Sequence, residues 1–146
     1  MPAAFNKFNA FVQAVGRKQD NLHTDTLKIM LTNTAPVATN SLYSDISGTE
    51  LASGNGYTTG GTAVASNAYS HTSGTAKLTG NKVVWTATGS MGPFRYCVLY
   101  DSTSGDLIGW WDYGSGLTLT SAQTFTVGNS NDGTNWTSTY SICSVQ

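Results

Sequence analysis

Charged side chains are scarce in this sequence of 146 residues, of which only 10% are Asp, Glu, Lys or Arg, and the formal net charge is −1. So little charge creates no field that would attract nucleic acid or an anionic membrane. No apolar run approaches the roughly 20 residues that cross a bilayer. The opening residues also lack the apolar core and cleavage pattern of a signal peptide, and we expect none. We therefore expect neither nucleic acid nor a membrane as a partner.

Cysteine is also scarce, because Cys97 and Cys143 are the only two in the chain. Two residues are too few for a disulfide framework. Cys97 falls within an expected strand, where a free cysteine is usually a small apolar core residue. The spacing leaves a bridge between the two open, and we expect both thiols to be reduced.

Serine and threonine are abundant, at about a quarter of the chain, and there are 16 glycines. This composition is typical of an all-β protein with many turns. A chain of this length is expected to form one domain and to bury roughly two thirds of its unfolded surface. Short strands separated by turns at intervals of about 8 to 12 residues favour an antiparallel β-sandwich or jelly roll.

The most informative stretch is the aromatic-rich segment 83–113, which we expect to contain a hairpin. Large side chains alternate along 94–100, a polar turn follows at 101–106, and 107–113 returns. Trp110 and Trp111 are adjacent in the returning strand, so they must point to opposite faces. The hairpin therefore needs a second covering layer, either a packed sheet of the same chain or another protein molecule.

Other strands are expected from similar alternation, and 26–32 is the clearest, with Leu27, Ile29 and Leu31 inward. The segment 41–50 is interpreted as an irregular turn and 54–61 as a glycine-permitted turn. The remaining expected strands are 62–69, 75–79, 82–88, 117–120 and 124–127, the last two as a pair.

Residues 1–22 differ in kind from the β-sandwich domain expected over residues 23–146. Their apolar positions predict a helix that ends at Gly16, namely Phe8, Phe11, Val12 and Val15. One interpretation is a short helix closing one end of the sandwich, and the other is an arm that docks on a neighbour. The arm is favoured weakly by charge: four Lys and Arg against two Asp leave residues 1–33 at +2, and the remainder at −3.

Catalytic residues are not indicated by any spacing. His23 and His71 stand alone, so we expect them to be exposed and to bind no metal. A pair of carboxylates can in principle converge as in glycosidases, but capping of the turn explains Asp101 and Asp106 equally well. We expect neither enzymatic activity nor a cofactor.

Four segments carry a family resemblance: 27–46, 54–61, 83–103 and 107–127. They resemble small virion proteins of tailed bacteriophages, most specifically in MGPFRYCVLYD (91–101) and LIGWWDYG (107–114). The resemblance implies a head decoration, or cement, protein that is assembled in the host cytoplasm and lies on the capsid exterior. Its implied partner is the major capsid protein, and a monomer, dimer or trimer are all open.

The candidate contacts with the capsid are the apolar and basic residues of the N-terminal segment and two aromatic residues of the hairpin: Phe5, Phe8, Phe11, Val12, Arg17, Lys18, Trp110 and Tyr113. Exposed aromatic rings beside small polar residues can instead stack on sugars, although the core is the expected place for Trp85 and Trp111. The alternative function is therefore a tail or fibre-associated module that binds host glycans through Trp110, Tyr113 or Trp136.

Overall fold

The computed structural model describes residues 4–128 and 135–137, with the backbone alone for 75, 77 and 135–137. The chain is mostly strand, and its paired strands are antiparallel, as the sequence predicts. Its strands are β1 (Phe5–Lys7), β2 (Leu27–Thr32), β3 (Thr62–Ala63), β4 (Ala68–Thr72), β5 (Thr75–Asn81), β6 (Val83–Thr86), β7 (Met91–Asp101), β8 (Leu107–Leu119), β9 (Thr124–Val127) and β10 (Asn135–Thr137). Its helical elements are α1 (Asn9–Gly16), α2 (Tyr43–Ile46) and the 3-10 turn η1 (Ser47–Thr49).

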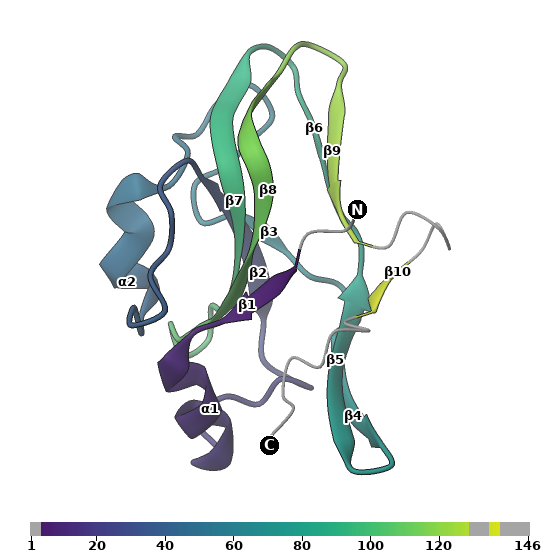
Figure 1. The fold of residues 1–146 in the computed structure, drawn as a ribbon. Helices are drawn as coiled ribbons and strands as arrows, with labels where there is room; N and C mark the ends of the chain where they lie inside the picture. The colour runs from purple at the N-terminus through teal and green to yellow at the C-terminus, as the bar shows by residue number, and fades with distance from the viewer. Residues whose placement is uncertain (1–3, 129–134, 138–146) are drawn as a thin grey trace.

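The strands form a sandwich-like arrangement of one large and two small sheets. The large sheet has the order β1-β8-β7-β2-β3, and the small sheets are β10-β5-β4 and β6-β9. In Figure 1 the two small sheets lie on one side of the β7–β8 hairpin, and α2 lies on the other side. Elements of the same chain therefore lie on both sides of the hairpin.

Strand β2 shows the effect of this double cover. Leu27, Ile29 and Leu31 are buried, as predicted, but Met30 on the opposite face is also fully buried. Thr32 on that face is also buried, whereas Lys28 is half-buried, so the cover over this face extends along most of the strand.

The expected β7–β8 hairpin is present, but β8 is longer than predicted. Tyr96 pairs with Asp112 and Phe94 pairs with Leu117, so Arg95 alone lies opposite residues 113–116. This bulge lets β8 continue to Leu119 beside β7. The prediction that 117–120 pairs with 124–127 is therefore wrong, and β9 pairs with β6 instead.

Two other segments differ from the prediction. The strand expected over 62–69 is interrupted, because Ser66 has a φ of 54° and the Asn67 amide donates to Leu22 O at 2.7 Å. The segment 41–50 is not an irregular turn but forms α2 and η1. Asp45 stabilises the start of α2, since its carboxylate accepts backbone N–H groups of Ser41 and Leu42 at 2.9 Å each.

The glycine-rich turn 54–61 is confirmed. Gly54 and Tyr57 exchange backbone hydrogen bonds of 2.9 and 3.1 Å. Gly61 has a φ of +77° and lies against β2, where a Cβ would come within 2.9 Å of Met30 Cα. A side chain at Gly61 would therefore force the turn away from the sheet.

The N-terminal segment is part of the same core. Strand β1 extends the edge of the large sheet beside β8, and α1 follows it and ends at Gly16, as predicted. The predicted apolar face of α1 is mostly confirmed, since Phe8 and Phe11 are buried and Val15 packs against the core. The exception is Val12, which is 48% exposed, while Ala14 is buried instead. Within the described residues, neither helix has the length and apolar character of a membrane-spanning segment.

Candidate interaction surface

Trp110 and Trp111 are held by the N-terminal segment, one on each face of β8. Phe8 contacts Trp110 with ring centroids 4.6 Å apart, and Phe5 contacts Trp111 at 4.9 Å. Both indoles remain only partly buried. The second layer that the sequence demanded for this hairpin is thus supplied in part by the chain itself, and each indole keeps some surface in solvent.

The register of β1 explains how the two phenylalanines reach their positions. Phe5 pairs with Trp111, and Lys7 pairs with Gly109. A Cβ at Gly109 would lie 2.6 Å from Asn6 O, so only glycine lets β1 approach this closely. The sequence shows Gly109, but nothing nearby in the sequence indicates its partner strand.

The predicted contact residues of the N-terminal segment separate into two groups. Phe8 and Phe11 are fully buried, so their side chains belong to the core and offer no surface to another molecule. Val12, Arg17 and Lys18 are exposed, and Phe5 is intermediate. Periodicity identified the helix but not which of its apolar residues would face the core.

The two basic residues lie where α1 ends. Arg17 N donates to Gln13 O at 2.9 Å and Lys18 N donates to Val15 O at 3.2 Å. Lys18 then adopts a left-handed φ of 59°. The positive charges are therefore at the negative end of the helix dipole, where they are favourable and remain accessible to a partner.

Tyr113 is exposed at the bulge of β8, with 53% of its surface accessible. Its ring contacts Phe125 at 5.8 Å, whereas Trp110 contacts Phe8. The two rings are thus engaged by different parts of the molecule and do not share one contact cluster. The side chain of Trp136 lies outside the described residues, although its backbone pairs with Gly80.

An ion pair stands beside Tyr113. Arg95 Nε and Nη2 donate to the two oxygens of Asp112 at 2.7 and 2.9 Å. This bidentate contact lowers the pKa of Asp112, and Arg95 also lies 5.3 Å from the centre of the Tyr96 ring. Both partners are more than a third exposed, so solvent screens the pair and it contributes little to stability.

The carboxylates of the β7–β8 turn are buried. Asp101 Oδ1 accepts from the backbone N–H groups of Thr103 and Ser104 at 2.8 and 3.3 Å, which confirms the predicted capping role. Asp106 and Asp20 lie close by and are also buried. Nothing in the sequence indicated that Asp20 would join this cluster of carboxylates. Buried carboxylates that stabilise a turn are not placed as a glycosidase pair, which needs an open cleft around the substrate.

Glu50 is another carboxylate with several hydrogen-bond partners, and the sequence did not indicate it. It accepts hydrogen bonds from the hydroxyls of Tyr43 and Tyr57 and from Gly60 N, the last at 2.6 Å. Tyr57 also accepts from Leu31 N at 3.0 Å, and burial raises the pKa of its phenol. Glu50 therefore fastens the glycine-rich turn to β2 and has no free acceptor side that suggests catalysis.

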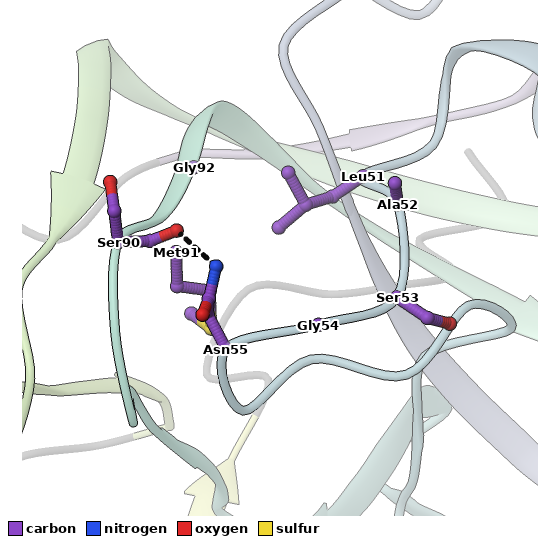
Figure 2. Close-up of a pocket in the computed structure, with 8 residues that line it drawn as sticks. All are labelled: Leu51, Ala52, Ser53, Gly54, Asn55, Ser90, Met91 and Gly92. Carbon is purple, nitrogen blue, oxygen red and sulfur yellow. Dashed lines mark hydrogen bonds between the residues drawn. The ribbon is translucent and has the colours of Figure 1, made fainter.

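A shallow pocket of about 180 Å³ lies between the glycine-rich turn and the start of β7. Figure 2 shows Asn55 on one side donating through Nδ2 to Ser90 O, at 2.8 Å, with Leu51 and Met91 nearby. Its lining holds no acid or base that could activate the hydroxyls of Ser53 and Ser90. The lining residues are Leu51, Ala52, Ser53, Gly54, Asn55, Ser90, Met91 and Gly92.

Metal-binding geometry is not found among the described residues, where no three His, Cys, Asp or Glu side chains are placed to hold an ion. His23 and His71 are exposed, as predicted. Cys97 is a free thiol, and its burial raises its pKa to about 12, so it stays uncharged. Cys143 lies outside the described residues.

No protein-family model, curated protein or solved structure matches this chain.

Proposed function

We propose that this chain is a structural virion protein of a tailed bacteriophage, which decorates the capsid exterior and cements copies of the major capsid protein. The observation that carries the proposal is the pair of partly exposed tryptophans on β8, each held in place by a phenylalanine of the N-terminal segment. The resemblance of segments 91–101 and 107–114 to virion proteins supports it.

The exposed residues suit a binding role better than a catalytic one. Large rings fixed on a sheet lose little conformational freedom when a partner covers them, so their burial contributes efficiently to affinity. Arg17 and Lys18 add charge that orients the encounter. A protein that binds only the assembled lattice stabilises that lattice by mass action.

Mass spectrometry of purified virions tests the proposal directly. We expect the copy number to be comparable with that of the major capsid protein. A few copies per particle would contradict capsid decoration and indicate a tail component, and a particle map would show where the extra density lies.

A matched pair of variants tests the surface. Val12 and Val37 are 48% and 56% exposed, so Val12→Asp and Val37→Asp place the same charge at similarly accessible positions. We expect Val12→Asp to weaken binding to capsids roughly tenfold, while Val37→Asp binds as the wild type does. Equal binding by both variants would remove α1 from the interface.

The alternative, a tail or fibre-associated module for host glycans, receives less support. Its proposed stacking residues Trp110 and Tyr113 contact different aromatic partners. Binding of the purified protein to a glycan array or to host cell walls, lost on Tyr113→Ser, would establish that alternative.

A further inference from the structure

Four aspartates meet where the segment after α1 contacts the β7–β8 turn. Asp20 and Asp25 come from the segment between α1 and β2, whereas Asp101 ends β7 and Asp106 precedes β8. Asp20, Asp101 and Asp106 are only 5%, 0% and 7% exposed. A carboxylate that ionises there loses most of its hydration and must be compensated by donors or by positive charge.

The available donors satisfy only part of this cluster. Ser104 Oγ donates to Asp20 Oδ1 at 2.8 Å, and backbone N–H groups of the turn donate to Asp101 Oδ1. The other oxygens, Asp20 Oδ2, Asp101 Oδ2 and Asp106 Oδ2, are buried without a hydrogen-bond partner. Three unpartnered buried acceptors at one junction require an explanation.

Nearby positive charge does not explain how these unpartnered oxygens are tolerated. The charged groups that act on Asp20 are Asp106 and Asp101, and the one that acts on Asp101 is Asp25. All of these groups are acidic, and the one ion pair of the described residues, between Arg95 and Asp112, lies elsewhere.

Among the described residues, no other segment around the cluster forms an ion pair with these aspartates. The neighbouring segment 41–45 contributes Asp45, whose carboxylate is taken up by the N–H groups of Ser41 and Leu42. The segment before β4 contributes the neutral amide of Asn67, which donates to Leu22 O and Asp25 O. No three acidic or histidine side chains of the described chain are arranged to bind a metal ion.

We propose that these carboxyl groups share protons in two pairs, Asp20 with Asp106 and Asp101 with Asp25, and so form an acid-dependent clasp between residues 17–26 and the β7–β8 turn. The side chains of each pair lie within hydrogen-bonding reach of one another. A proton from water on one carboxyl group makes it a donor to the other, which gives the unpartnered oxygens a partner. When the proton returns to water, two like charges remain in a buried position and repel.

The clasp works close to neutral pH. Burial raises the pKa of Asp20 to about 7, and burial likewise raises that of Asp101 to about 6. The segment that the clasp fastens begins with Arg17 and Lys18, which follow the end of α1. This inference concerns the chain's own fold and does not depend on the proposed capsid role.

Carbon-13 NMR of aspartate carboxyl groups in the wild-type protein is the direct test. We expect Asp20 to titrate at about 7 and Asp101 at about 6, far above an exposed aspartate, near 4. Full ionisation of both by about pH 5 would overturn the proposal.

Hydrogen exchange of residues 17–26 and 101–106 then measures the clasp itself. After correction for intrinsic rates, opening should be about tenfold more frequent near pH 8 than near pH 6, as linkage requires for one group that titrates near 7. Asp20→Asn keeps the shape without the charge and should remove this tenfold difference. Asp45→Asn, on the exposed start of α2, should retain it.

Two results would contradict the clasp. One is the same pH dependence in Asp20→Asn as in the wild type. The other is closure of the segment near pH 8 by millimolar calcium as complete as closure by acid, which would show that a cation, rather than a proton, joins the carboxylates.

Discussion

Glu50 and Asp20 are two inward-facing carboxyl groups in opposite situations. Glu50 accepts two tyrosine hydroxyls and one backbone N–H, with donors on both of its oxygens. Asp20 receives one serine hydroxyl, and its second oxygen has no donor. Protein donors replace the water around the Glu50 carboxylate. The Asp20 carboxyl group loses its water without gaining enough donors in exchange.

Glu50 is half-buried and well supplied with donors, whereas Asp20 is buried and has few, so donors and burial together separate the two carboxyl groups. A carboxylate with donors on both oxygens braces the fold through its hydrogen bonds. A poorly partnered one raises its pKa until a proton becomes the missing partner, and the contact then depends on pH. This molecule contains both within one domain.

Among the proposed changes, Glu50→Ala should have the largest effect on the free energy of unfolding. It leaves the buried Tyr57 hydroxyl and Gly60 N–H without their acceptor, and we expect a loss of about 3 kcal/mol in the free energy of unfolding. Urea denaturation measures it. Glu50→Gln, which keeps one acceptor oxygen, should cost clearly less, and equal losses would mean that packing rather than hydrogen bonding is responsible.

The pH dependence of unfolding sharpens the comparison. Asp20 and Asp101 have folded-state pKa values of about 7 and about 6, above the ordinary 3.8, so their contribution is fully present below 3.8 and is lost as the pH rises through about 6 to 7. Asp45 and Asp112 have lowered pKa values and act oppositely, losing their contribution as the pH falls below 3.8.

We therefore expect maximal stability near pH 4, and a decline of roughly 2 kcal/mol between pH 5 and pH 8 after allowance for partial solvent screening. Thermal or urea unfolding across this range measures the decline. Asp20→Asn should flatten it, and stability that rises from pH 5 to pH 8 would refute the assigned direction.

Ser104→Ala should have the smallest effect, about 1 kcal/mol, because it removes a single hydroxyl that donates to Asp20 and accepts from Asp106 N. The loss of that donor should also move the titration of Asp20 to still higher pH. Carboxyl NMR provides the measurement, and an unchanged titration would mean that Ser104 does not partner Asp20 in solution. Ser102→Ala, in the same turn but bonded to Thr26 O, is the matched control.

The alternation of side chains along the sequence correctly predicted several strands. The alternation in 94–100 and 26–32 predicted β7 and β2, and adjacent Trp110 and Trp111 predicted cover on both faces. The returning strand was expected over 107–113, but β7 keeps pairing beyond it and β8 continues to Leu119. Whether glycine ends a strand or bulges it is decided by the neighbouring strand, which a single sequence does not identify.

The candidate sites were less predictable for the same reason. Asp20 and Ser104 are 84 positions apart, and no local rule brings them together. Phe8 and Phe11 were expected to be contact residues, yet large apolar side chains of a short helix are the first to be buried in its own domain. Glu50 lay in a segment without clear periodicity, so its tyrosine partners could not be inferred.

The pairing of Phe5 with Trp111 has a consequence for the order of assembly. During synthesis the chain makes β1 early, but the strand it joins emerges only after about a hundred further residues. Until then two phenylalanines have no lasting partner in the nascent polypeptide. The pairing of β1 with β8 is therefore expected to complete the large sheet late, because β1 is translated long before β8. Strands that are far apart in the sequence are slow to pair.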